Sequence, residues 1–357
     1  MPGKVADPTY GRYLMPPSIA EKALAADTEV GVDIRRRRAF YEKDGRYIKG
    51  DDVSITVDEL KPEPGKGGKR RWVYYEVWTS PKGRGGPADG CDIIMVHGMG
   101  GYTGHYAPMV STLLVYGFRV IVPDLPGHGR STGRHVLIKY PYQLADGVRT
   151  AVKDVSTLSG PPRKRMMMGA SLGGYTALTY CLPNHKDSAT DVDGLYLECP
   201  LIGVTPDSDL DPVSWVIAKS LGRTPMGKVP IVKGVATIAT KNERVINEWL
   251  ADPRGYHGGL RMLTGVTLLH GLKAIANEAK TFDTPIHIVH GDHDRVTSHV
   301  GSVNFIKDAA STDKGITIMP GMEHALSIVG LTEEEDRPRQ QVLRDRDTWL
   351  LERVTVK

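Results

Sequence analysis

Short continuous apolar runs, each ending in glycine or a polar residue, recur along most of the chain, and helix-forming stretches separate several of them. Apolar residues at consecutive rather than alternating positions are typical of strands buried on both faces, as in a parallel sheet covered by helices. The runs are DIIMVHG, FRVIVPD, RMMMGAS, GLYLECP, PIHIVHGD and GITIMPG. The pattern therefore predicts an α/β fold, with helices on both faces of a mostly parallel sheet.

The first part of the chain has a different pattern. Residues 1–45 are mostly polar and include four consecutive arginines, Arg35 to Arg38, which we interpret as the solvated end of a helix formed by IAEKALAADTEV. VSITVDEL alternates as a strand does, and a Pro/Gly/Lys turn separates it from its expected hairpin partner, RWVYYEVWTSP. We expect an N-terminal extension over residues 1–45 and the first part of the core over residues 46–200.

Residues 201–283 interrupt the alternation of strands and helices, because they contain no good strand candidate. PVSWVIAKSL, NERVINEWL and GGLRMLTGVTLLHGLKAIANEA have helical patterns. So long an insertion predicts a helical cap over the carboxyl ends of the strands. The second part of the core then covers residues 284–357 and ends with the charged helical pattern RQQVLRDRDTWLLERV.

Composition and charge exclude several classes of protein. Charged residues make up 25% of the chain and the net charge is only +4, which is too small for this size to indicate a nucleic-acid partner. No run reaches the roughly 18–20 apolar residues of a membrane span, and no signal-peptide core is visible. Three cysteines do not make a disulfide framework, so we expect them to be small buried residues. We expect a cytoplasmic protein, with peripheral contact to a membrane or lipid-droplet surface left open.

The segment RMMMGASLGG carries Gly169-Ala170-Ser171-Leu172-Gly173 between a strand and the helical YTALTYCL. A sharp strand-to-helix turn strains the backbone at the serine, and small residues two before and two after it relieve the clash. The turn exposes the hydroxyl above the sheet, where the helix N-terminus stabilises negative charge. This context predicts that Ser171 is a catalytic nucleophile.

A second glycine-rich loop, MVHGMGGYTGHY, follows an earlier strand. In folds with this kind of nucleophile turn, one oxyanion donor is the N–H after the nucleophile, here Leu172, and the other comes from such a loop. We take the Met99 N–H as the second donor and Gly98 as a substrate-binding candidate, since glycine allows close approach. We expect His97 to be structural and to bond to loop backbone.

The base and the acid are expected in the order Ser, Asp, His along the chain. IVHGDHDRV follows a strand, and its spacing favours Asp294 as the acid, with Asp292 as a turn-capping residue. GMEHAL follows the last strand and places His324 where the base belongs. The His and Asp residues of IVHGDHDRV also suggest a metal site, but no matching set of ligands is evident elsewhere in the chain. We therefore predict no metal and no cofactor.

With these residues placed, the chain resembles the monoacylglycerol lipases and the serine-aminopeptidase-like branch of the α/β-hydrolases. HGMGGYTGHY, FRVIVPDLPGHGRSTGRH, GASLGG, GDHDRV and GMEHAL are similar to its motifs, over roughly residues 70–353. The chain departs from the usual G-H-S-M-G-G of that family by having Ala170 and Leu172. The resemblance implies that Asp124, Gly127, His128 and Gly129 are structural residues of the turn after a strand.

The leading interpretation is a hydrolase of carboxylic esters, acting on monoacylglycerols or similar single-chain esters. The same triad also serves amidases, peptidases, thioesterases and acyltransferases, so these stay open as alternatives. A ligand receptor on a hydrolase scaffold is a remote alternative. In the cap, the apolar residues of VSWVIAKSL, among them Trp215 and Ile217, are candidates for the mouth of an acyl tunnel. Lys219 and Arg223 at its rim would favour an anionic lipid surface.

Overall fold

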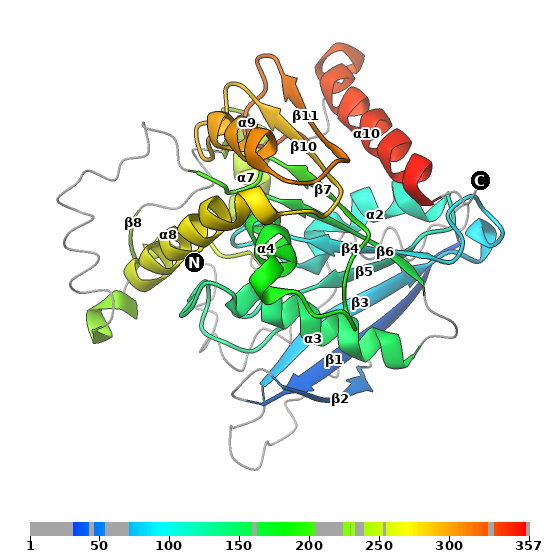
Figure 1. Cartoon of the computed structure of the whole chain (residues 1–357), viewed down its shortest axis with the longest axis horizontal. Helices are drawn as coiled ribbons and strands as arrows, with labels where there is room; N and C mark the ends of the chain where they lie inside the picture. The colour runs from blue at the N-terminus through cyan, green and yellow to red at the C-terminus, as the bar shows by residue number, and fades with distance from the viewer. Residues whose placement is uncertain are drawn as a thin grey trace.

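A nine-stranded sheet forms the centre of the computed structural model, in the order β11-β10-β7-β6-β4-β5-β3-β1-β2 (Figure 1). The structure describes residues 31–42, 46–53, 71–158, 163–203, 224–228, 230–232, 239–252, 255–327 and 332–354. Neighbouring strands from β5 to β11 are parallel, whereas β1, β2 and β3 are antiparallel to their neighbours. The strands are β1 (Asp33–Tyr41), β2 (Tyr47–Asp52), β3 (Arg71–Thr79), β4 (Cys91–Val96), β5 (Arg119–Pro123), β6 (Lys164–Ala170), β7 (Gly194–Glu198), β10 (Ile286–Gly291) and β11 (Lys314–Met319).

Helices cover both faces of this sheet, as the apolar pattern predicted. Side chains of β4 alternate between two cores: Ile94 and Val96 belong to one, Ile93 and Met95 to the other. A continuous apolar run is therefore needed, because both faces of the strand are buried. On the first face pack α3 (Gln143–Thr157), α4 (Leu172–Cys181), α8 (Met262–Glu278) and α9 (His299–Asp308), and on the second α2 (Ala107–Leu114) and α10 (Glu333–Val354).

The four arginines lie inside strand β1, so the prediction that they end a helix is wrong. The stretch IAEKALAADTEV lies outside the described residues. β1 falls within residues 1–45 and pairs with β3 along its whole length. Alternation sends the guanidinium groups to both sides of the strand, where β2, β3 and α3 supply carboxylates. The ion pairs join Arg35 to Asp52, Arg36 to Glu76, Arg37 to Asp154 and Arg38 to Asp51.

The predicted hairpin partner of β3 is not the strand that the structure pairs with it. β3 lies between β1 and β5. VSITVDEL begins at Val53, and the rest of it lies outside the described residues. The neighbour of β3 therefore comes from the arginine-rich segment.

Between β7 and β10 the structure describes parts of the predicted cap. α7 (Glu243–Ala251) and α8 agree with two of the three helices expected there. β8 (Pro230–Val232) and β9 (Leu260–Arg261) pair antiparallel, which corrects the prediction that residues 201–283 contain no strand. PVSWVIAKSL, with Trp215 and Ile217, lies outside the described residues.

Two expectations from composition can be compared with the structure. All three cysteines are free thiols in buried positions. Within the described ranges, no helix combines the length and the apolarity that crossing a bilayer requires.

Candidate active site

Ser171 lies in the sharp turn between β6 and α4. Its backbone has φ 55° and ψ −116°, in the positive-φ region where a residue with a side chain is strained. The Ser171 amide donates to Glu198 O at 3.0 Å, and its carbonyl accepts from Leu201 N at 3.0 Å. These bonds to the end of β7 hold the strained turn in place.

The glycines on either side of Ser171 make the turn possible. A Cβ on Gly169 would lie 2.5 Å from Gly173 O, and a Cβ on Gly173 would lie 2.1 Å from Val96 O. Both distances are far inside van der Waals contact with backbone atoms that cannot move aside. Only glycine fits at these two positions, which is the steric reason for the G-x-S-x-G pattern.

The loop after β4 lies directly against the serine. A Cβ on Gly98 would lie 3.6 Å from Ser171 Cβ. Leu172 is the first residue of α4 and belongs to the core of that face, and Met99 packs against the same core. Among the described residues, neither the Met99 nor the Leu172 amide donates a hydrogen bond to the protein. The two predicted oxyanion donors therefore lie on the segments that flank Ser171.

His97 holds this loop through its ring. Its Nε2 accepts from Leu125 N at 3.0 Å, so the ring proton lies on Nδ1, which is 2.8 Å from Gly98 O. Burial lowers the pKa of His97 to about 4, and the ring is neutral at physiological pH. The predicted bonding of His97 to loop backbone is confirmed.

Asp124 is the centre of the turn after β5. Its carboxylate is fully buried and accepts from Thr103 N at 2.7 Å and from Arg130 N at 2.6 Å. A Cβ on Gly129 would lie 2.1 Å from Asp124 Oδ2. Asp124 and Gly129 thus have the structural role that the resemblance implied, and they link this turn to the loop that carries Met99.

The loops after β10 and β11 bring a carboxylate and an imidazole together. The Asp294 side chain has no exposed surface, and that of His324 is 9% exposed. His324 Nδ1 lies 2.7 Å from Asp294 Oδ2. A ring that donates from Nδ1 keeps Nε2 as its basic atom. The arrangement is that of a general base whose tautomer is set by a buried acid.

Both carboxylate oxygens of Asp294 accept hydrogen bonds. Oδ1 accepts from the amides of Val296 and Thr297 at 2.7 and 2.9 Å. Oδ2 accepts from Thr297 Oγ1 at 2.7 Å and from His290 Nε2 at 3.1 Å, in addition to His324. Burial by itself raises the pKa of Asp294, but the hydrogen bonds from His290 and His324 outweigh it and hold that pKa well below its usual range. Asp294 is therefore an anion near neutral pH.

Asp292 has a different environment from Asp294. Its Oδ1 accepts from Gly321 N at 2.7 Å, and His293 N donates to Met322 O at 3.1 Å. These bonds join the turn after β10 to the loop that carries His324. The turn-capping interpretation of Asp292 agrees with this geometry.

His290 and Thr297 are contacts of Asp294 that sequence reasoning missed. His290 was considered only as a metal ligand, and Thr297 was not singled out. His290 is the last residue but one of β10, at the same edge of the sheet as the other site residues, which is the signal that could have found it. Thr297 carries no comparable signal, because its role depends on a side chain three residues earlier.

One group of side chains near the triad has metal-ligand types. Cys199, Asp294 and His324 place a sulfur, an oxygen and a nitrogen within 4.8 Å of one another. A metal needs the Cys199 thiolate, but burial and the nearby Asp294 charge raise the pKa of that thiol well above its usual value. Asp294 Oδ2 already accepts three hydrogen bonds. The donor set therefore fits a metal poorly, and the predicted absence of a metal stays a prediction.

Part of the cap touches two of the loops that carry predicted site residues. Tyr256 N donates to Gly100 O at 2.9 Å, and Tyr102 OH donates to Asp252 Oδ2 at 2.7 Å. On the other side, Lys241 N donates to Glu323 Oε2 at 2.7 Å. The segment around α7 thus bridges the loop with Met99 and the loop with His324.

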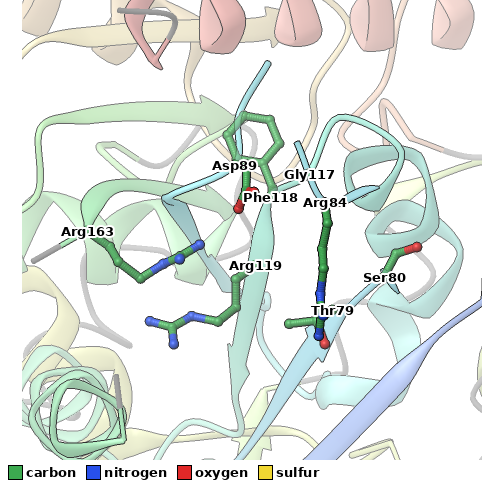
Figure 2. A pocket seen from close by; sticks show the side chains of 8 residues that line it. All are labelled: Thr79, Ser80, Arg84, Asp89, Gly117, Phe118, Arg119 and Arg163. Atoms are coloured by element: carbon green, nitrogen blue, oxygen red, sulfur yellow. The ribbon is translucent and has the colours of Figure 1, made fainter. Parts of the chain in front are cut away.

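A cavity of about 170 Å³ lies far from Ser171 and has arginines in its wall (Figure 2). Arg119 and Arg163 stand where β5 and β6 begin, whereas Ser171 follows the end of β6. Both guanidinium groups bind the buried carboxylate of Asp92, at 2.6 Å each. Because these cations already have a partner, we assign this cavity no part in the active site.

Residues 91–328 match the model of a protein family described as serine aminopeptidase, S33. The match covers well over half of the chain and includes Ser171, Asp294 and His324. The monoacylglycerol lipase of Mycolicibacterium smegmatis is 27% identical over 293 residues, which are 80% of this chain and 95% of that protein. Caffeoylshikimate esterase of Arabidopsis thaliana is 26% identical over 269 residues, 73% of this chain and 78% of that protein.

The monoglyceride lipase of Saccharomyces cerevisiae is similar in both sequence and structure. Its sequence is 26% identical over 320 residues, which cover 85% of this chain and 97% of that protein. A crystal structure of its soluble variant, in complex with a substrate analogue, has a TM-score of 0.67 at 25% identity, with the same coverage of both chains. The chain therefore belongs to the serine aminopeptidase S33 family of α/β-hydrolases and is a serine hydrolase of its esterase and lipase group.

Proposed function

We propose that the protein hydrolyses carboxylic esters with a single acyl chain, monoacylglycerols first among them, through an acyl-enzyme on Ser171. The observation that supports this most directly is the 2.7 Å contact between His324 Nδ1 and Asp294 Oδ2 on loops at the same edge of the sheet as Ser171. A neutral imidazole held in this tautomer is suited to take a proton from a serine hydroxyl.

In the proposed reaction, Ser171 Oγ attacks the ester carbonyl while His324 Nε2 takes its proton. The Met99 and Leu172 amides donate to the oxyanion, each contributing roughly 2.7–4 kcal/mol to the stability of the transition state. His324 then protonates the leaving alcohol. Water, deprotonated by the same nitrogen, releases the acid and regenerates Ser171. Asp294 stays ionised throughout and stabilises the imidazolium.

The choice of monoacylglycerols rests on two supports. Relatives from Mycolicibacterium smegmatis and Saccharomyces cerevisiae are named as lipases of monoacylglycerols, and they align over most of this chain. The cap segment around α7 contacts the loop next to Ser171, and we infer that it borders the space for an acyl chain. We further propose that Gly98 borders the bound ester and that Trp215 and Ile217 contact its acyl chain.

The test is kcat/KM for monoacylglycerols from acetyl to dodecanoyl, with simple esters, acyl-CoAs and aminoacyl amides beside them. Each buried methylene contributes about 0.8 kcal/mol, so kcat/KM should rise about fourfold per methylene until the chain fills its site. Trp215→Ser and Ile217→Ser should reduce this dependence, and Ser171→Ala gives the background. Equal turnover of acetyl and dodecanoyl esters would contradict an acyl site, and preference for amides or acyl-CoAs would contradict the ester assignment.

A further inference from the structure

His290 is a second histidine on the acid of the candidate triad. It is the fifth residue of β10, its side chain has no exposed surface, and both ring nitrogens have partners. Nε2 lies 3.1 Å from Asp294 Oδ2, and Nδ1 lies 2.8 Å from Ser302 Oγ on α9. A buried ring with two partners has one orientation.

The partners also define which nitrogen carries the proton. Asp294 is a carboxylate, so it can only accept, and Nε2 must be the donor of the bond between them. In a neutral ring Nδ1 then accepts from the Ser302 hydroxyl, which can rotate to donate. The serine therefore holds His290 in the tautomer that donates to Asp294.

Thr297 connects the three groups. Its Oγ1 lies 2.7 Å from Asp294 Oδ2, 3.3 Å from His290 Nε2 and 3.3 Å from His324 Nδ1. Oδ2 thus receives two imidazole donors, one from β10 and one from the loop after β11, and one hydroxyl. The negative charge of Asp294 is shared between His324 and His290.

We propose that His290 is a positioning residue of the active site, which holds the Asp294 carboxylate by donating from Nε2 to Oδ2, the same oxygen that His324 contacts. This inference rests on the proposed function, because it assigns Asp294 the role of acid. His290 itself touches neither the ester nor Ser171 in this assignment.

Sharing the charge has a consequence for pH dependence. When His290 is lost, the negative charge on Oδ2 interacts more strongly with His324. This stronger interaction favours the protonated form of the His324 imidazole. Since only the neutral imidazole can act as base, the acid limb of kcat/KM moves to higher pH. The carboxylate also loses one of its constraints, so kcat falls.

The other groups that face His290 are few. His299 on α9 has its ring centre 6.3 Å away, and Cys199 after β7 lies close to Asp294. Asp294 is the carboxylate that contacts His290, and burial raises the pKa of the Cys199 thiol well above its usual value, so that thiol keeps its proton near neutral pH. The expected shift therefore arises at Asp294 and His324.

The test compares His290→Leu with His290→Gln. Leucine fills the space without a donor, whereas glutamine places an amide N–H near the position of Nε2. For His290→Leu we expect kcat to fall up to about 100-fold with little change in KM, and the acid limb to move up by about one pH unit. In His290→Gln, kcat and the position of the acid limb should both be close to those of the wild type. His287→Leu, on the same strand but bonded to Thr317 instead, is the matched control and should leave the profile unchanged.

If His290 had a purely structural role, His290→Leu and His290→Gln would have the same kcat and the same pH profile, and that result would overturn the proposal. A second measurement needs no variant and no turnover: ¹⁵N-coupled NMR of the imidazole protons in the unmodified protein. It should show a hydrogen-bonded N–H on Nε2 of His290 and another on Nδ1 of His324. A proton on Nδ1 of His290 instead would refute the inference. Because the NMR result does not depend on hydrolysis, its failure is distinguishable from failure of the proposed function.

Discussion

Two buried carboxylates lie at opposite edges of the sheet, Asp92 where a parallel strand begins and Asp294 just after a parallel strand ends, and they differ in the kind of partner that neutralises them. Asp92, at the start of β4, binds Arg119 and Arg163. Asp294, after β10, binds two imidazoles and a hydroxyl. Guanidinium groups keep their protons at any pH the protein meets, whereas imidazole changes charge near neutrality.

The comparison separates a structural ion cluster from a reactive one. Asp92 is paired with guanidinium groups that stay charged, so its cluster can hold strands together. These groups do not release or take up a proton near neutral pH. In the proposed mechanism, the charge of Asp294 faces the His324 ring, which is neutral before the reaction and positive during it. A buried carboxylate is thus informative about chemistry only when its partners can titrate.

The largest expected effect is at the reactive end. Ser171→Ala and His324→Ala should each lower kcat by about 10⁵- to 10⁶-fold, because the nucleophile and its base act as one unit. The double variant should be little worse than either single one. The measurement is turnover of a chromogenic ester, with thermal unfolding as the control that both variants fold. Activity above a few per cent in Ser171→Ala would show that another group is the nucleophile.

The next effect distinguishes two aspartates of one loop. Asp294→Asn should lower kcat by about 10⁴-fold, since the amide cannot stabilise the imidazolium and favours the wrong tautomer of His324. Asp292→Asn keeps an oxygen acceptor for Gly321 N and should change kcat little, while lowering the free energy of unfolding by about 1 kcal/mol. Steady-state kinetics and urea titration of both variants are the measurements. The reverse order of the two kcat values would reassign the acid.

At the structural end, the effect should be on stability alone. Asp92→Asn leaves two guanidinium groups without their carboxylate and should lower the free energy of unfolding by about 3 kcal/mol. The kcat of the folded fraction should stay at the wild-type value. Asp89→Asn, exposed in the wall of the same cavity, is the control and should be nearly neutral. A large fall in kcat for Asp92→Asn would mean that the two ends are coupled.

The smallest effect concerns the pH dependence of stability at His97. Its pKa is about 4 in the folded protein and about 6.5 unfolded, so below pH 6.5 the unfolded chain binds the extra proton. The stability from this group is present above pH 6.5 and is lost as pH falls toward 4. Between pH 7 and 5 the wild type should lose about 2 kcal/mol from this source. His97→Gln, compared by urea titration at both pH values, should not show that part of the loss, and an unchanged pH dependence would contradict the assignment.

Strands and helices of the sheet could be predicted because their signals are local. DIIMVHG and PIHIVHGD are continuously apolar, and only burial on both faces explains such runs. The turn around Ser171 could also be predicted, because a side chain on Gly169 or Gly173 would collide with backbone atoms of the same or a neighbouring segment. The order Ser, Asp, His placed Asp294 and His324 on loops that the structure brings into contact.

Features that depend on distant partners could not be predicted in this way. Arg37 is stable in a strand because Asp154, more than a hundred residues later, receives its charge. Only the folded sheet brings His290 to Asp294 together with Ser302 on a following helix. β8 and β9 are too short to carry a periodic signal, and they exist through their pairing with each other.

The most direct measurement of the central claim is the site of covalent labelling by a fluorophosphonate, located by mass spectrometry. The reagent reacts with a serine that is activated by a neutral base and leaves an adduct that mimics the tetrahedral oxyanion. We expect one adduct per chain, on Ser171, with loss of ester hydrolysis in proportion to labelling and no adduct in Ser171→Ala. An adduct on another residue, or full hydrolytic activity after complete labelling of Ser171, would contradict the assignment of the nucleophile.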